Sequence, residues 1–271
     1  MLHVHPIDAL DRPELAPYRT MRRQLEHREQ RILVAEGVKV TQRLLESECT
    51  VVSVLLTPEW LQQLEPLLRR RREDMAVFVA PKAAMQNLTG FSMYQGVLAV
   101  GRIPPAPTLA RLIAQTAAPR LFAAVDGLSS AENLGGLVRN AVAFGAHGLL
   151  VGETSVSPYL RRAVRSSMGA IFQLPVIEVS NLAETLHELR AQSIRCLAAH
   201  PHTDRRTIFQ TDLTGDCCLV FGSEGYGLSA PVLEASDEAV AIPIAPTVDS
   251  LNVGSASAIF FCEARRQRGR T

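Results

Sequence analysis

The second half of the chain, residues 119–271, alternates short apolar runs with amphipathic segments of helical spacing. The apolar runs carry few charges, as expected of strands buried on both faces of a parallel sheet. They predict strands at Leu121–Val125, Gly148–Val151, Ile194–Ala199, Cys217–Phe221 and Ala239–Ile242. The other segments predict helices at Asn133–Phe144, Tyr159–Met168, Leu182–Gln192, Ala230–Ala235 and Leu251–Gln267. This strict alternation predicts an α/β fold with helices on both faces of a parallel sheet.

A smaller α/β unit precedes the proline-rich segment RIPPAPT at Arg102–Thr108, whose prolines exclude regular structure. The spacing in this unit predicts helices at Glu36–Glu48, at Pro58–Arg72 and from Pro81 onward, and strands at Val51–Leu56, Met75–Ala80 and Gly96–Gly101. We therefore expect one domain at residues 1–103 with a helical lead-in, a linker at 104–118 and a second domain at 119–271.

Composition limits the classes of function. The length of 271 residues fits two domains, and a net charge of +1 argues against a globally basic nucleic-acid binder. The five cysteines have no C-x-x-C spacing, which indicates reduced thiols and no zinc site. The N-terminus lacks the apolar region of a secretion signal, and no run approaches the roughly 20 apolar residues of a membrane span. We expect a soluble, cytoplasmic protein without a membrane segment.

Three loops follow predicted strands at the carboxyl edge, where parallel sheets bind ligands. After the first strand, Asn133 stands at a helix start and Arg139 lies within that helix. A capping asparagine and a solvated arginine would account for each residue alone. Gly135 and Gly136 lower helix propensity, which favours a close backbone approach at this point. No G-x-G-x-x-G sequence is present, so an ordinary dinucleotide site is unsupported.

The second loop, FGSEGYGLS at Phe221–Ser229, places glycines around Glu224 and Tyr226, as many tight turns do. It has no G-K-[ST] and is not a P-loop. In the third loop, Ile242–Asn252, Ser250 and Asn252 are residues that cap helix starts. The small residues that follow let another backbone approach, so we expect the last helix to lie against another helix or a ligand-binding loop.

Taken together, the three loops resemble the motifs of the SpoU (TrmH-like) branch of the SPOUT RNA methyltransferases. The chain reads Asn133…Arg139, then Gly222-Ser-Glu224-Gly225-Tyr-Gly227, then Ile242-Pro-Ile…Ser250-Leu251-Asn252-Val. Their order and separation are similar to those of the family, and RSSMGAIFQLPV resembles its connecting segment. The passages VAEGVKVTQRLLES and GFSMYQGVLAV are similar to the ribosomal-protein-like substrate-binding domain that many members carry.

The resemblance implies transfer of a methyl group from S-adenosylmethionine to a ribose 2′-hydroxyl of RNA. It implies a deep trefoil knot from about Leu219 to Arg266 and a homodimer whose active site is completed across the interface. The implied cofactor-binding residues are Gly222, Gly225, Ile242 and Leu251. The implied catalytic residues are Arg139, Asn133, Glu224, Ser250 and Asn252.

Arg139 corresponds to the family's catalytic arginine, for which a role as general base is one hypothesis. A guanidinium has a pKa far above neutral pH and does not readily give up its proton, which disfavours that role. We favour binding of the phosphate beside the target ribose and stabilisation of developing oxyanion charge. Ser250, Asn252 and Asn133 would orient the hydroxyl and the arginine, and Glu224 would fix this polar network.

Two groups of arginines are candidate RNA contacts, with a solvated surface as the alternative for each. The RNA-binding candidates are Arg161, Arg162, Arg165, Arg22 and Arg23. His200 and His202 lack further ligands at metal-binding spacing, so we expect no metal.

The two-domain layout resembles members that modify rRNA, so 2′-O-methylation of large-subunit (23S) rRNA is the predicted function. A tRNA 2′-O-methyltransferase and an antibiotic-resistance rRNA methyltransferase remain alternatives. A catalytically silent RNA-binding or ribosome-assembly factor is the alternative from another class. The presence of all five catalytic candidates argues against a catalytically silent protein.

Overall fold

The computed structural model describes residues 2–8, 11–21, 23–89, 96–201 and 206–269, and its internal contacts divide the chain into two compact units. Unit 1 comprises Met1–Pro105 and Tyr159–Phe172, and unit 2 comprises Ala106–Pro158 and Gln173–Thr271. The boundary after Pro105 lies inside the segment predicted to be a linker. That segment is partly regular, since it contains helix α6 (Leu109–Gln115), and the Thr108 hydroxyl caps this helix by accepting from the Arg111 amide at 3.2 Å.

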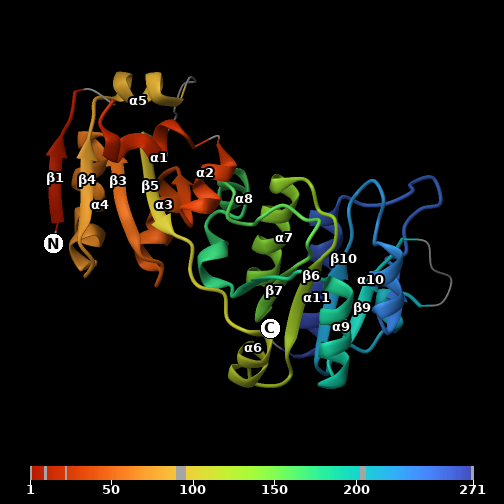
Figure 1. Ribbon diagram of the computed structural model, residues 1–271. Helices are drawn as coiled ribbons and strands as arrows, with labels where there is room; N and C mark the ends of the chain where they lie inside the picture. Colours follow the sequence, from red (N-terminus) through yellow and green to blue (C-terminus); the bar gives the residue numbers. More distant parts are fainter. Residues whose placement is uncertain (1, 9–10, 22, 90–95, 202–205, 270–271) are drawn as a thin grey trace. The chain divides into compact units, whose positions relative to one another are not determined.

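Unit 1 is a mixed sheet with helices. Its strands, in spatial order, are β1 (Leu2–Pro6), β4 (Met75–Val79), β3 (Val51–Leu56), β5 (Val97–Arg102) and β2 (Ile32–Glu36). Strands β1, β4 and β3 run parallel, whereas β5 is antiparallel to both β3 and β2. Its helices are η1 (Pro13–Leu15), α1 (Ala16–Arg19), α2 (Gln24–Glu29), α3 (Val38–Glu46), α4 (Pro58–Arg70), α5 (Lys82–Thr89) and α8 (Arg161–Ser166) (Figure 1).

The helical lead-in predicted for unit 1 contains helices but begins with strand β1. The predicted helix from Glu36 starts later, because Glu36 ends strand β2 and Gly37 turns the chain with a φ of 94°. This left-handed conformation is favourable for glycine alone. Part of the passage GFSMYQGVLAV, residues 90–95, lies outside the described residues.

Helix α8 lies far along the sequence but packs in unit 1, whereas the sequence places it in the second domain. The Glu36 carboxylate pairs with Arg161 and also with Arg165, whose Nη1 lies 3.1 Å from Glu36 Oε1. Arg43 donates a hydrogen bond of 2.6 Å to the Met168 carbonyl. These contacts with residues distant in sequence explain why residues 159–172 pack in unit 1, although the sequence predicts them in the second domain.

Unit 2 contains an all-parallel sheet, as the alternation predicts. Its strands, in spatial order, are β11 (Glu238–Val240), β9 (Arg195–Ala199), β10 (Cys217–Phe221), β6 (Leu121–Val125), β7 (Gly148–Val151) and β8 (Val176–Glu178). The central strands β10 and β6 are buried along their whole length. The helices of unit 2 are α6, α7 (Ala131–Ala143), α9 (Leu182–Ala191), η3 (Ile208–Gln210), α10 (Ala230–Ala235) and α11 (Val253–Gln267). The short helix η2 (Ala170–Gln173) has its first three residues in unit 1 and Gln173 in unit 2.

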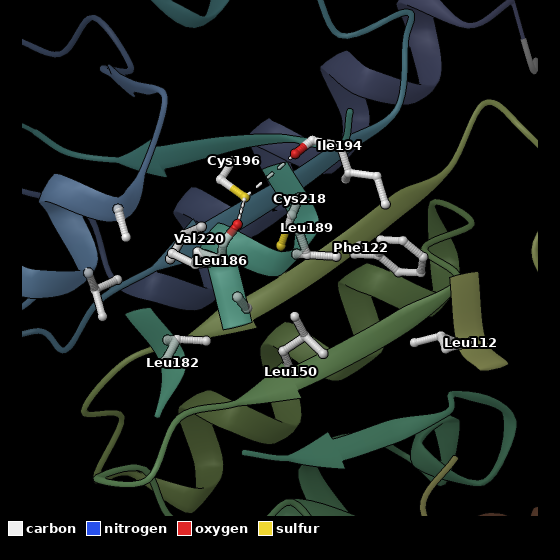
Figure 2. Packing of buried hydrophobic residues seen from close by; sticks show 13 residues of the cluster. Leu112, Phe122, Leu150, Leu182, Leu186, Leu189, Ile194, Cys196, Cys218 and Val220 are labelled. Carbon is white, nitrogen blue, oxygen red and sulfur yellow. Dashed lines mark hydrogen bonds between the residues drawn. The ribbon is translucent and has the colours of Figure 1, made fainter. Parts of the chain in front are cut away.

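Alternate residues of the central strands face two separate helix layers. On one face, Phe122 and Cys218 join a cluster formed with helices α6, α9 and α10 (Figure 2). In this cluster the Cys196 sulfur lies 3.7 Å from the carbonyl oxygens of Leu186 and Ile194. On the other face, the Phe221 ring contacts Phe260 and Phe261 of α11, and α11 packs against α7. The sheet is therefore covered on both sides.

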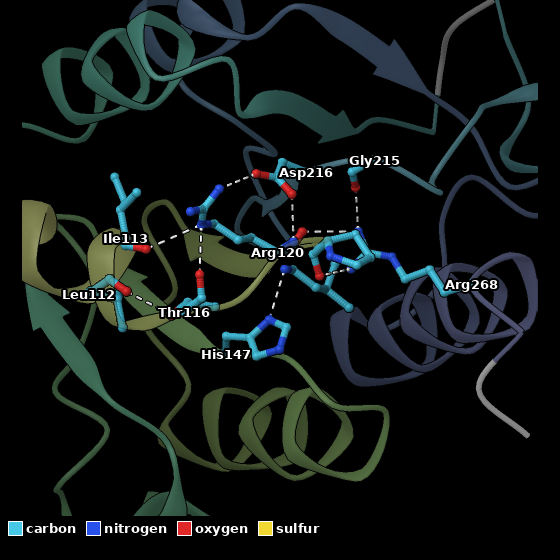
Figure 3. Close-up of polar contacts among 10 residues, drawn as sticks. Leu112, Ile113, Thr116, Arg120, His147, Gly215, Asp216 and Arg268 are labelled. Atoms are coloured by element: carbon cyan, nitrogen blue, oxygen red, sulfur yellow. Dashed lines mark hydrogen bonds and ion pairs between the residues drawn. The ribbon is translucent and has the colours of Figure 1, made fainter.

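A polar cluster fastens the end of α11 to the segments that lead into β6 and β10 (Figure 3). Arg268 donates to the carbonyls of Leu213, Gly215, Pro119 and Arg120 at 2.7–3.0 Å. Arg120 in turn pairs with Asp216 at 2.6 Å. Burial raises the pKa of the adjacent Cys217 thiol to about 11, so this thiol is protonated at neutral pH and serves packing.

Candidate functional site

The loops after β10 and β11 line a cavity of about 350 Å³ in unit 2. Its apolar wall includes Phe221, Val240, Leu251 and Phe260, and the backbone of Gly222–Leu228 forms another side. All four predicted cofactor-binding residues, Gly222, Gly225, Ile242 and Leu251, lie in this lining. Its size and its mixed apolar and polar lining fit a small organic ligand with several polar anchors.

Three of the predicted catalytic residues, one from each loop, form a single polar network. The Asn133 Nδ2 atom donates to Glu224 Oε2 at 2.5 Å. The Asn252 Nδ2 atom donates to Glu224 Oε1 at 2.5 Å and contacts Asn133 Oδ1 at 3.2 Å. Each carboxylate oxygen therefore holds one amide, and hydrogen bonds to an ionised acceptor are stronger than neutral ones. Glu224 is the centre that joins the three loops.

Asn252 also caps helix α11. Its Oδ1 atom accepts from the Gly254 backbone amide at 2.9 Å, which leaves its Nδ2 group for Glu224. Capping and network formation are thus two functions of one amide. Asn133 has no capping role, because α7 starts earlier and Ser130 is its N-cap, accepting from the Asn133 amide at 3.2 Å. Ser250 is exposed and lines the cavity.

The turn that carries Glu224, residues 223–227, depends on a close approach between the backbone of Gly222 and that of Gly227 and Leu228. Ser223 and Gly227 exchange two backbone hydrogen bonds, each of 2.9 Å. A Cβ atom on Gly222 would lie 2.3 Å from the Gly227 carbonyl carbon and 2.4 Å from the Leu228 nitrogen. Only glycine fits this position without displacement of the turn.

Asp126, at the carboxyl end of β6, is a positioning residue that the sequence analysis did not identify. It is 6% exposed, and its Oδ2 atom accepts from the Ser229 amide at 2.7 Å. Its backbone amide donates to the Phe221 carbonyl, so Asp126 contacts both ends of the Gly222–Ser229 loop. The sequence feature that could have identified Asp126 is its place directly after a buried strand, at the edge of the sheet where ligands bind.

The cavity also includes residues from a fourth loop, the one after β9. His200 and Pro201 line it, together with Asp249 of the third loop. His200 was predicted to be a loop residue without a metal, and His202 lies outside the described residues. Within the described parts of the chain, no cluster of three or more His, Cys, Asp or Glu residues is arranged to hold a metal ion.

Arg139 does not belong to the network. It is exposed on α7, and no hydrogen bond or ion pair links it to another residue in the described parts of the chain. The next residue, Asn140, ties α7 to α11 by donating to the Gly254 carbonyl at 2.7 Å and contacting the Ser257 hydroxyl at 3.0 Å. The guanidinium is therefore carried on a fixed helix and is available to a ligand.

The predicted RNA-binding arginines differ in accessibility. The Arg161 side chain is only 13% exposed and pairs with Glu36, so its role is to hold α8 in unit 1. Arg165 shares Glu36 but is 61% exposed, and Arg162 is exposed. Arg23 is 71% exposed and pairs with Glu26 at 2.9 Å. Arg22 lies outside the described residues.

Comparison with known proteins identifies the class to which this fold and site belong. The chain belongs to the SpoU rRNA Methylase family, whose model matches residues 120–262, nearly the whole of the second predicted domain. An uncharacterized tRNA/rRNA methyltransferase of Mycobacterium bovis is 33% identical over 243 residues, covering 87% of this chain and 81% of that protein. The 23S rRNA (guanosine-2′-O-)-methyltransferase RlmB of Photorhabdus laumondii is 33% identical over 211 residues, covering 76% and 86%.

A solved structure extends the similarity to both units. The SpoU methyltransferase AviRb of Streptomyces viridochromogenes, in complex with its cofactor AdoMet, matches with a TM-score of 0.81 and 25% identity. The match covers 96% of this chain and 99% of AviRb. In the described part of the chain, no helix has the length and apolar character needed to cross a membrane.

Proposed function

We propose that this protein transfers a methyl group from S-adenosylmethionine to a ribose 2′-hydroxyl of 23S rRNA. The observation that carries the proposal is the Glu224 network, which joins Asn133 and Asn252 beside a ligand-sized cavity. The family membership and the similarity to RlmB support RNA as the substrate and the 2′-hydroxyl as the acceptor. A cytoplasmic location follows for an enzyme that modifies ribosomal RNA.

The cavity fits the cofactor by its size and its wall. Gly222, Ile242 and Leu251 would hold the adenine and ribose through backbone groups, and Gly225 leaves open space beside the turn. AviRb, which has the same fold, binds AdoMet. The bound cofactor supplies a sulfonium-activated methyl group, and the chain's own residues supply the positioning of the acceptor. Orienting two reactants can contribute about 7–11 kcal/mol to the lowering of a barrier.

The hydrogen bonds around Glu224 suggest a role for each residue of the site. Glu224 fixes both asparagine amides, so that Asn133 and Asn252 orient the ribose hydroxyl. The exposed Ser250 joins them from the third loop. Arg139 binds the phosphate beside that ribose, where its positive charge stabilises the oxyanion that develops as the 2′-hydroxyl loses its proton to water. Its position outside the network suits a residue that meets its partner only when RNA or a second copy of the chain is present.

RNA contact by unit 1 and α8 is part of the proposal. The exposed arginines Arg23, Arg162 and Arg165 bind phosphate in this scheme, while Arg161 keeps a structural role. Unit 1 acts as the ribosomal-protein-like substrate-binding domain. Phosphate contacts of this kind make RNA affinity fall steeply with salt concentration.

We also propose a trefoil knot formed by the segment from about Leu219 to Arg266. Arg268 supports this inference, because it fastens the end of α11 to the residues that precede β6 and β10. Helix α11 also packs against α7, which comes much earlier in the chain.

The exposed side of α11 supports a homodimer. Ser255, Ala258, Ile259 and Cys262 are spaced on one stripe of the helix, and all four are exposed or half-buried. Small residues allow a second copy to approach closely. In this dimer the Arg139 of one copy and the network of the other complete the active site.

Substituting Ala258 by arginine tests the dimer. An unpaired guanidinium in the interface costs several kcal/mol, so the association constant is expected to fall at least about 100-fold, with methyl transfer falling in parallel. Sedimentation velocity and a methyl-transfer assay measure the two effects. Ala191→Arg, at an exposed position of α9, is the matched control and keeps both properties. A wild-type protein that is active as a monomer contradicts the dimer.

Radiolabelled S-adenosylmethionine, incubated with separate unmodified rRNA and tRNA pools, tests the proposed function. Label is expected in 23S rRNA, at a position whose 3′ phosphodiester resists alkali because the 2′-oxygen is blocked. Label in tRNA alone would assign the substrate to tRNA. Protection of the ribosome from an antibiotic by the modified rRNA would assign a resistance role. The absence of label in every RNA would leave only a silent RNA-binding factor.

A further inference from the structure

Tyr226 is the most exposed large hydrophobic residue in the described chain. Its relative exposure is 98%, compared with 75% for Leu25 and 66% for Phe209. A fully exposed aromatic ring gains nothing for the stability of the fold. Exposed aromatic side chains at functional surfaces instead bind flat ligands.

The backbone that carries this ring is fixed. The Tyr226 amide donates to the Ser223 hydroxyl at 3.1 Å, inside the turn closed by Ser223 and Gly227. The contact of Gly222 with Leu228 and the hydrogen bond from Ser229 to Asp126 hold the rest of the loop. The backbone that carries the tyrosine ring is therefore positioned before a ligand binds, which lowers the entropic cost of binding.

Both faces of the ring are open to solvent, since Tyr226 is 98% exposed. The residues on either side are Gly225 and Gly227, and a Cβ atom built on either glycine would meet nothing within 4 Å. No ring contact involving Tyr226 occurs among the described residues. A planar ligand can therefore lie against the ring without displacing a side chain.

The ring stands beside the site proposed to orient the ribose. Tyr226 lines the same cavity as Glu224, two residues earlier in the turn, whose carboxylate holds Asn133 and Asn252. A nucleotide whose ribose lies at this network has its own base, or a neighbouring base, within reach of the turn. Unstacked RNA bases bind aromatic side chains in this manner.

We propose that Tyr226 stacks on a nucleobase of the RNA at or next to the methylated nucleotide. This inference rests on the proposed function. It assigns binding of the base at the same site to Tyr226. Stacking tolerates any base, because every base has a π-face, so Tyr226 contributes affinity and positioning more than sequence discrimination. Loss of one aromatic platform is expected to weaken RNA binding roughly 5- to 150-fold.

Kinetics with an in vitro transcript of 23S rRNA test the proposal. Tyr226→Ala is expected to raise the KM for the transcript roughly 5- to 150-fold, with a much smaller effect on the KM for S-adenosylmethionine and on kcat. Tyr226→Phe and Tyr226→Trp keep the ring and are expected to keep the wild-type KM. Phe209→Ala is the matched control, since Phe209 is an exposed ring that does not line the cavity.

Three results would overturn the proposal. An unchanged KM in Tyr226→Ala excludes stacking, and an equal loss in Tyr226→Phe assigns the effect to the hydroxyl. A loss accompanied by a changed sedimentation coefficient assigns the ring to a contact between protein chains. The failure of the proposed function looks different, because the wild-type protein itself would then transfer no label to the transcript.

Fluorescence supplies a readout that does not depend on catalysis. Trp60 is the single tryptophan of the chain, so Trp60→Phe combined with Tyr226→Trp places one indole in the turn. Adding the transcript is expected to quench this indole, whereas the Trp60→Phe parent has no tryptophan signal to lose. Binding of the transcript, seen by filter retention, without quenching would refute stacking at this position.

Discussion

Replacement of Arg139 by alanine is expected to lower kcat about 10²–10³-fold, the usual effect of removing one donor that stabilises an oxyanion. Arg139 is exposed on α7 and holds no partner among the described residues, so its loss leaves the packing of unit 2 unchanged. The cavity does not include it, so affinity for S-adenosylmethionine is expected to stay at the wild-type level. Single-turnover kinetics and calorimetric titration with the cofactor measure these two quantities separately.

Arg139→Lys separates the two hypotheses for the arginine. Lysine keeps the charge but lacks the planar fork of donors, so we expect partial activity and an unchanged pH profile. If the residue acted as a general base, the lower pKa of a lysine would move the rise of the rate with pH, which reports deprotonation of the base, to lower pH. A rate collapse with intact cofactor binding would show that the fork geometry is essential.

The matched control is Arg111→Ala. Arg111 is also exposed in unit 2, on α6, and among the described residues its side chain hydrogen-bonds only to Gln115 on the same helix, at 3.4 Å. Its removal changes the net charge by the same amount as Arg139→Ala, so it corrects for general weakening of RNA attraction. If both variants lose activity equally, the specific role of Arg139 is refuted.

The architecture of unit 2 was predictable because its strands are continuous apolar runs. Leu121–Val125, Gly148–Val151 and Cys217–Phe221 coincide with β6, β7 and β10. Strand β8 was not predicted, since Val176–Glu178 is too short to show a period and is only partly buried. In unit 1, strand β2 was not predicted because its apolar run joins the helical pattern of α3 through Gly37.

The polar site was predictable where the chain's motifs coincide with strand ends. Asn133, Glu224 and Asn252 meet because β6 and β10 are neighbouring parallel strands and α11 packs on α7. The sequence could not reveal which carboxylate joins which amide, nor that Glu36 holds Arg161. Such pairings depend on three-dimensional proximity between residues 28 to 125 positions apart. Asp126 was likewise identified only through its contact with Ser229.

Gly222→Ala is expected to cost both stability and activity. The added Cβ would lie within 2.5 Å of backbone atoms of Gly227 and Leu228, and backbone cannot move aside as a flexible side chain can. Overpacking of this kind costs typically about 1–3 kcal/mol in the free energy of unfolding. The displaced turn also carries Glu224 away from Asn133 and Asn252, and a misplacement of about 1 Å can cost roughly 100-fold in rate.

Thermal unfolding and single-turnover methyl transfer measure the two effects of Gly222→Ala. Gly215→Ala is the control, because a Cβ there would meet nothing within 4 Å and the residue lies outside the cavity. A Gly222→Ala protein with wild-type melting temperature and wild-type transfer would mean that the turn adapts freely. In that case the close approach could not be what positions Glu224, and the Asp126–Ser229 hydrogen bond would have to hold the loop alone.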